Sequence, residues 1–434
     1  MLRDSSRHFV RAALIALLAS ITGSGCMRIQ SAQPLVASQA EVRQVPTQES
    51  ATTGLWPARW AGEGSMGVIV PVEGPLSSWR GMRLGPEHYL RGGPDEQEDA
   101  ALLAASTRAE SGYRYILEGP GSFIFQRQRE GRARVTDSNP AAMFKFVSAR
   151  LAVEFQGMPV VMLERSWLAY YDSAAEQPRG LIALAPGLFG VPEPVIDRFV
   201  ELCRADGWAV LRLLAPPSRF TERITFSIDR NNLDASARTI AAELGQRAAE
   251  TAYAIEAGVR HVHTLRPDLA DGTHVLIGMS GGAMASSTIL ARNAPRFDAA
   301  VFIAGGANFL MINEESNYAP WVEAMTFEYG EPALTSREKR AMFDEVATRY
   351  LENAPLDGHH LAESIRGIPI LMLHGTNDRA VPSRYGDQLW EKLGKPERWV
   401  YQVGHELMFM TLNAQTPRVL RWLRQQEFDR GEEQ

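Results

Sequence analysis

From residue 180 onward, the chain alternates between short apolar runs and longer segments with helical spacing. The run at 180–185 is continuous, as expected of a strand that is buried on both faces. The other predicted strands lie at 208–214, 273–279, 299–305, 368–374 and 398–403, and the helical segments lie at about 193–206, 234–264, 281 onward, 384–393 and 415–427. This alternation predicts an α/β fold with a doubly wound, mostly parallel sheet over residues 166–430.

Upstream of that region the hydrophobic pattern is weaker. Three strand-like runs and one helical pattern predict a small α+β module over residues 59–165. The strand-like runs lie at 67–72, 113–118 and 122–126, and the helical pattern lies at 96–110. Residues 27–58 are rich in Gln, Ser, Ala, Thr and Pro and show no periodicity. Such a composition buries too little apolar surface to fold, so we expect a tether there.

Residues 1–26 have the pattern of a signal peptide. Arginines precede an apolar run over 12–21, which is shorter than the roughly 20 residues that a membrane span needs. The run ends in Thr-Gly-Ser-Gly-Cys, which resembles the lipobox of bacterial lipoproteins, although Gly23 stands where leucine or a similar residue is usual. The resemblance implies a lipid anchor on Cys26 and an extracytoplasmic protein of the bacterial cell envelope. An ordinary secretory signal, which would release the protein, is the alternative.

Composition, charge and cysteine content limit the classes of binding partner and the disulfide bonds that we expect. The chain has 434 residues and a formal net charge of −6, and its basic residues form no stripe, so we expect no nucleic-acid binding. Its two cysteines are Cys26 and Cys203. Acylation of Cys26 would leave no partner for a disulfide, and Cys203 lies in an apolar helical run where a packing role is expected.

A serine among glycines stands where a predicted strand gives way to a helix. Residues 278–282 read Gly-Met-Ser-Gly-Gly, the only G-x-S-x-G match in the chain. A buried strand before it and small residues after it are the context of a nucleophile elbow, which exposes Ser280 above the sheet. Ser280 as an ordinary helix N-cap is the alternative, but a cap does not require glycines on both sides.

A serine hydroxyl needs a base, and the base needs an orienting acid. Asp378 and His405 follow later predicted strands, in the chain order of α/β-hydrolases. The segment HGTNDRAVP at 374–382 resembles the HGxxDxxVP segment of serine hydrolases and prolyl-oligopeptidase-like peptidases of the α/β-hydrolase superfamily. This resemblance, over about 180–427, implies that fold and Asp378 as the acid of a triad. Asp298 is a rival acid.

The tetrahedral intermediate needs two N–H donors. The backbone N–H of Gly281, directly after the serine, is the first candidate. By analogy with the His-Gly-x segment of related enzymes, Leu188 supplies the second, from the loop after the strand at 180–185. Pro186 replaces the usual histidine there. A glycine-rich turn without function is the alternative.

Other chemistry-bearing residues have weaker contexts. His374 is expected to form the turn before Asp378. The pair His261 and His263 is a weak metal signal without a carboxylate cluster, and we expect no metal or organic cofactor. An insertion over 307–366 stands where these folds carry a cap over the site. His359 and His360 of this insertion are expected in solvent. Its aromatic residues Trp321, Phe327 and Tyr329 line an acyl pocket or form the cap's own core.

We therefore expect a serine hydrolase that cleaves carboxylic esters of a small-molecule or peptide acyl substrate. The double glycine at 281–282 resembles the peptidase branch of the superfamily, so a serine peptidase is the alternative. The N-terminal module is too short for the propeller of the oligopeptidases, which favours the esterase. A non-catalytic envelope scaffold on the same fold is a third interpretation. The sequence does not indicate an oligomeric state.

Overall fold

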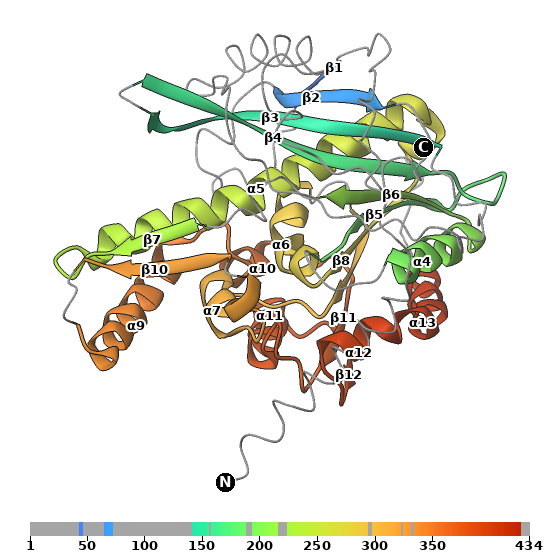
Figure 1. The fold of residues 1–434 in the computed structure, drawn as a ribbon. Coiled ribbons are helices and arrows are strands. Elements are labelled where there is room, and N and C mark those ends of the chain that lie inside the picture. The colour runs from blue at the N-terminus through green and yellow to red at the C-terminus, as the bar shows by residue number, and fades with distance from the viewer. Residues whose placement is uncertain are drawn as a thin grey trace, which may run out of the picture. The chain divides into compact units, whose positions relative to one another are not determined.

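The computed structural model describes residues 43–46, 65–72, 141–155, 158–187, 193–215, 224–293, 297–322, 324–330 and 334–426. Their main feature is a ten-stranded sheet with the order β1-β2-β3-β4-β6-β5-β8-β9-β11-β12 (Figure 1). Neighbours from β6 to β12 are parallel. These six strands are β6 (Trp208–Ala215), β5 (Gly180–Ala185), β8 (Thr273–Met279), β9 (Ala299–Ile303), β11 (Ile370–Gly375) and β12 (Glu397–Tyr401). The predicted α/β class with a mostly parallel sheet is confirmed.

The other four strands extend the same sheet with antiparallel pairs. They are β1 (Arg43–Pro46), β2 (Ser65–Val72), β3 (Ala142–Phe155) and β4 (Met158–Tyr171). β4 pairs directly with β6 and continues past the boundary predicted at residue 165. The hairpin of β3 and β4 is not among the predicted strands. The division into domains stays a prediction.

Several N-terminal predictions lie outside the described residues. They are the signal peptide with Cys26, the strand-like runs at 113–118 and 122–126, and the helical pattern at 96–110. Within the ranges given above, no helix is both long and apolar enough to cross a membrane.

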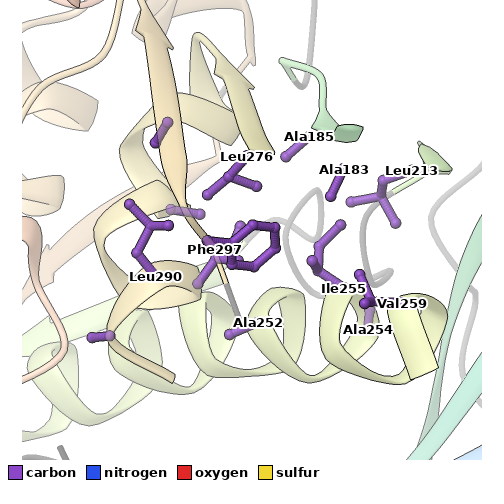
Figure 2. Packing of buried hydrophobic residues seen from close by; sticks show 14 of the residues in the cluster. Ala183, Ala185, Leu213, Ala252, Ala254, Ile255, Val259, Leu276, Leu290 and Phe297 are labelled. Carbon is purple, nitrogen blue, oxygen red and sulfur yellow. The ribbon is translucent and has the colours of Figure 1, made fainter. Parts of the chain in front are cut away.

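Helices cover both faces of the parallel strands. Strands such as β5 and β8 are therefore buried at every position. One face packs against α5 (Leu233–Leu265), α6 (Gly281–Asn293), α10 (Gly358–Ser364) and α11 (Ser383–Lys392). Figure 2 shows Ile255 and Val259 of α5 close to Ala183 and Leu213 of the sheet. The other face packs against α4 (Glu193–Ala205), α12 (His405–Met410) and α13 (Leu412–Gln425). Cys203 of α4 is fully buried there, in the packing role that the sequence predicts.

The predicted insertion shares a core with residues that precede it in the chain. It contains α7 (Phe309–Glu315), α8 (Ala319–Val322), β10 (Met325–Tyr329) and α9 (Ser336–Asn353). β10 pairs in parallel with β7 (Ile224–Ile228), and side chains from β7 and the first half of α5 pack against α7 and α9. Among its described residues, which also include α10, the regular elements of the insertion are helices except for β10. The second half of α5 packs on the sheet, so this 33-residue helix joins the two cores.

Candidate active site

Ser280 occupies a strained turn between β8 and α6. Its φ is 52°, in the left-handed region that residues other than glycine rarely adopt. Two backbone hydrogen bonds hold this conformation, from the Ser280 N–H to the Ile303 carbonyl at 2.8 Å and from the Met284 N–H to the Ser280 carbonyl at 2.9 Å. The turn therefore has the backbone conformation of a nucleophile elbow.

Two glycines allow other segments to approach this turn. A Cβ at Gly282 would lie 1.9 Å from the Ala185 carbonyl oxygen, so the start of α6 packs against the end of β5 as only glycine allows. A Cβ at Gly187 would lie 2.8 Å from the Ser280 Cβ and 3.3 Å from its Oγ. The loop after β5 therefore passes directly beside the serine.

Ser280, His405 and Asp378 form one hydrogen-bonded chain. The Ser280 Oγ lies 2.9 Å from His405 Nε2, and His405 Nδ1 lies 2.6 Å from Asp378 Oδ2. The His405 and Asp378 side chains are each 3% exposed. A carboxylate can only accept a hydrogen bond, so Nδ1 carries the imidazole proton and Nε2 is left to accept the serine proton.

The Asp378 carboxylate is fixed by its own loop. Its Oδ1 accepts hydrogen bonds from the N–H groups of Ala380 and Val381, both at 2.9 Å. The loop itself is bound to the end of β12, because the Thr376 N–H donates to the Tyr401 carbonyl at 2.9 Å. Oδ2 is therefore held in place toward the imidazole.

Two aromatic rings contact the His405 imidazole. Phe409 of α12 meets it edge to face with ring centroids 5.0 Å apart, and Tyr318 meets it at 6.0 Å with an interplanar angle of 88°. Tyr318 comes from the insertion, between α7 and α8, and its hydroxyl donates to Glu406 Oε1 at 2.7 Å. Burial, together with this bond, raises the pKa of the Tyr318 phenol.

The two predicted oxyanion donors are Gly281 and Leu188. Gly281 is the first residue of α6, so its N–H has no acceptor within the helix and stands directly beside Ser280. Leu188 lies outside the described residues, while Gly187 next to it approaches the serine as given above.

Asp298, the rival acid, lies elsewhere. Its Oδ2 accepts a hydrogen bond from the His274 N–H at 2.7 Å, near the start of β8, whereas Ser280 follows the end of that strand. His374 also has another environment. Its imidazole lies 3.7 Å from the Asp387 carboxylate, and burial lowers its pKa. The structure thus brings together Ser280, His405 and Asp378, and neither rival joins them.

Four other histidines in the described part of the chain form two pairs. His263 Nε2 lies 2.8 Å from His274 Nε2, and the His359 and His360 rings are in edge contact at 5.0 Å. His360 bonds to the Leu351 carbonyl. No group of three or more His, Cys, Asp or Glu side chains in the described part of the chain could hold a metal ion.

Two of the three aromatic residues that the sequence singled out, Phe327 and Tyr329, pack in the core of the insertion. Phe327 stacks on Phe226 at 6.1 Å and meets Phe343 at 5.1 Å, and Tyr329 packs against the same cluster. The side chain of Trp321 lies outside the described residues. Of the two interpretations given for these residues, the structure favours the core for Phe327 and Tyr329.

Tyr318 and Asp357 make contacts that no motif in the sequence predicts. Asp357 is 1% exposed and accepts hydrogen bonds from the N–H groups of Asn308, Phe309 and His359 and from the Tyr350 hydroxyl. The carboxylate thereby ties the start of the insertion to its end. For Asp357 the only sequence signal is its position as an N-cap before α10. For Tyr318 there was none, because 88 residues separate it from Glu406.

Comparisons with known proteins concern the fold. No protein-family model and no curated protein matches the sequence. The esterase Pf2001 from Pyrococcus furiosus is 13% identical, with 60% of this chain and 87% of the esterase covered, at a TM-score of 0.38. Est1E from Butyrivibrio proteoclasticus is also 13% identical, with 64% and 97% covered, at 0.39. An acylaminoacyl peptidase from Pyrococcus horikoshii is 12% identical, with 66% of this chain but 46% of the peptidase covered, at 0.40. These structural neighbours are esterases and a peptidase of the α/β-hydrolase fold.

Proposed function

We propose that this chain is a serine hydrolase that cleaves carboxylic esters through an acyl-enzyme intermediate. One observation carries the proposal, namely the hydrogen-bonded chain from the Ser280 Oγ through His405 to Asp378, at 2.9 Å and 2.6 Å. A hydroxyl, an imidazole and a buried carboxylate in this order are the parts of a nucleophile, a general base and its orienting acid.

In the first half of the reaction, the Ser280 Oγ attacks the carbonyl carbon and its proton moves to His405 Nε2. The tetrahedral intermediate collapses, the C–O bond to the alcohol breaks, and the leaving oxygen takes that proton from His405. Water then attacks the acyl-enzyme by the same proton route and releases the acid. Asp378 keeps the imidazole in the required tautomer and stabilises the imidazolium.

The developing oxyanion needs donors beside Ser280. We assign the first to the N–H of Gly281, which has no acceptor within α6 because it is the first residue of that helix. We assign the second to the N–H of Leu188. The close approach of Gly187 to the Ser280 side chain supports a donor from this loop.

A fluorophosphonate probe tests the proposal directly, since it reacts with a serine that a neighbouring base activates. The wild type should take the label stoichiometrically and Ser280→Ala should take none. Ser286→Ala is the matched control, because its hydroxyl is buried and bonds to the Gly282 carbonyl within α6. A wild type without label would overturn the hydrolase proposal and leave the scaffold interpretation.

Substrate panels separate the two enzyme classes. Short-chain and long-chain acyl esters and aminoacyl amides should be offered to wild type and Ser280→Ala. Ester turnover without amide turnover is the expected result. Amide turnover without ester turnover would replace the esterase with the serine peptidase.

We also propose that Cys26 carries a lipid anchor in the bacterial cell envelope. The small residues before Cys26 support this, and the observation concerns sequence alone. Metabolic labelling with a fatty-acid analogue tests it, and Cys26→Ala should abolish the label. A wild type that is secreted without label would support the ordinary signal peptide instead.

A further inference from the structure

One short segment of the insertion contacts both the loop that carries the proposed acid and the start of α12, which carries the proposed base. The Asn317 N–H donates to the carbonyl of Arg379, the residue after Asp378, at 2.9 Å. The next residue, Tyr318, donates its hydroxyl to Glu406, the residue after His405, at 2.7 Å. Two consecutive residues therefore bridge the acid loop and the start of α12.

The ring of Tyr318 adds a third contact. It meets the His405 imidazole edge to face, with ring centroids 6.0 Å apart. The Tyr318 backbone is itself fixed, because its N–H donates to the Ser316 Oγ at 3.1 Å. The phenol stays protonated, since burial and the bond to Glu406 raise its pKa. The hydroxyl can therefore donate throughout the pH range of an enzyme assay.

These contacts act on the geometry that matters for proton transfer. Asp378 fixes Nδ1 of the imidazole, but the bond between Nε2 and the Ser280 hydroxyl is lost when the serine is acylated and cannot hold the ring through the whole reaction. Ring contacts from Phe409 and Tyr318 and the hydrogen bond from Tyr318 to the adjoining residue, Glu406, restrict the motion of the imidazole. Displacement of a base by a fraction of an ångström is costly, because the reaction needs Nε2 aligned with the serine proton.

We propose that Tyr318 is a positioning residue, which holds the His405 imidazole against Ser280 through its ring contact and its hydrogen bond to Glu406. This inference rests on the proposed function. The inference goes beyond the proposed function, because it makes turnover depend on the insertion as well as on the sheet.

The test compares Tyr318→Phe, Glu406→Ala and the double variant in ester hydrolysis and in the rate of fluorophosphonate labelling. Each single variant should lose about tenfold in kcat and in labelling rate, with KM within about twofold of the wild type. Both substitutions remove the same hydrogen bond, so the double variant should lose no more than either alone. Glu406→Gln keeps an acceptor oxygen and should stay within about threefold of the wild type.

Tyr170→Phe is the matched control, because it removes a hydroxyl that donates to Asp172 at 2.5 Å and leaves Tyr318 untouched. It should keep the wild-type kcat. Melting temperatures of all variants separate positioning from loss of folding. If Tyr318→Phe fails to fold, Glu406→Ala breaks the same bond from the other partner and serves in its place.

Two results would overturn the inference while the hydrolase proposal stands. One is a wild type that labels normally beside a Tyr318→Phe variant with unchanged rates. The other is a variant whose KM rises while its labelling rate does not change, because Tyr318 would then contact substrate instead of positioning His405. A wild type that takes no label would overturn the proposed function itself, and the inference with it.

Discussion

The Ser280 hydroxyl and the His405 imidazole lie 2.9 Å apart although 125 residues separate them along the chain. The parallel sheet explains this proximity. Ser280 follows β8, Asp378 follows β11 and His405 follows β12, and these strands end at the same edge of the sheet with β9 between β8 and β11. Side chains that follow parallel strands meet at their carboxyl ends, where open α/β sheets bind their ligands.

Replacement of Asp378 by Asn should separate the chemistry from the fold. The amide can still accept the two backbone hydrogen bonds that Asp378 Oδ1 accepts. It can also donate to His405 Nδ1, which then loses its proton and puts the wrong tautomer before Ser280. We expect kcat to fall by about 10,000-fold, as wrong-tautomer variants of such triads do.

Stopped-assay kinetics and the rate of fluorophosphonate labelling measure this loss, and circular dichroism checks the fold. Asp298→Asn is the control, because that carboxylate bonds to the His274 N–H and not to the imidazole. A loss of less than tenfold for Asp378→Asn would remove Asp378 from the proposed triad.

Gly187→Ala should impair the site by crowding alone. The added Cβ would lie 2.8 Å from the Ser280 Cβ, closer than such contacts occur, so either the serine or the loop after β5 must shift. We expect a loss of about 100-fold in kcat, because displacements near 1 Å have this effect. Gly330→Ala is the matched control, since a Cβ there meets no atom within 4 Å. Equal activity of the two variants would show that the loop after β5 does not constrain the serine.

The sequence predicted the parallel half of the fold because its signals are local. Strands buried on both faces appear as continuous apolar runs, and β5 and β8 are buried at every position. Ser280 and Asp378 follow such runs, and His405 follows the partly exposed strand β12, so strand prediction and chain order placed them at one edge. The ends of elements were less accurate, since the last helix was expected at 415–427 whereas α13 begins at Leu412, and α12 was not among the expected helices.

Pairings between distant segments were not predictable in this way. β3 and β4 carry lysine, arginine and glutamate among their apolar residues, which hides their period, and they join the sheet through tertiary pairing with β6. β7 and β10 pair across about 100 residues, as the Thr225 and Thr326 hydroxyls illustrate at 2.7 Å. The contact of Tyr318 with Glu406 is of the same kind, because neither residue carries a motif.

Asp357→Ala should destabilise the protein. The buried carboxylate accepts four hydrogen bonds, and its loss would leave the N–H groups of Asn308 and Phe309 and the Tyr350 hydroxyl without this acceptor. We expect the free energy of unfolding to fall by about 3 kcal/mol or more, as measured by urea denaturation. Asp344→Ala is the control, because that side chain is 54% exposed in its pair with Arg340, and it should change stability by about 0.5 kcal/mol at most. Equal losses in the two variants would contradict the tying role of Asp357.

His374 should make stability depend on pH. Burial lowers its pKa from the ordinary value of 6.5, and Arg398 acts in the same direction, although the carboxylates of Asp387 and Asp378 act against them. The unfolded chain therefore binds a proton at His374 at a higher pH than the folded protein does. Below pH 6.5 the unfolded state gains protons first, so this contribution to stability is complete above that pH and is lost as the pH falls toward the folded pKa.

The test is urea denaturation of wild type and His374→Gln at about pH 7.5 and at about pH 5. The variant should lose less stability between the two conditions, because glutamine does not titrate. Measurement at the higher pH gives the cost of the substitution itself, since the imidazole is neutral there in both states. An equal loss in wild type and variant would mean that burial of His374 does not couple its protonation to folding.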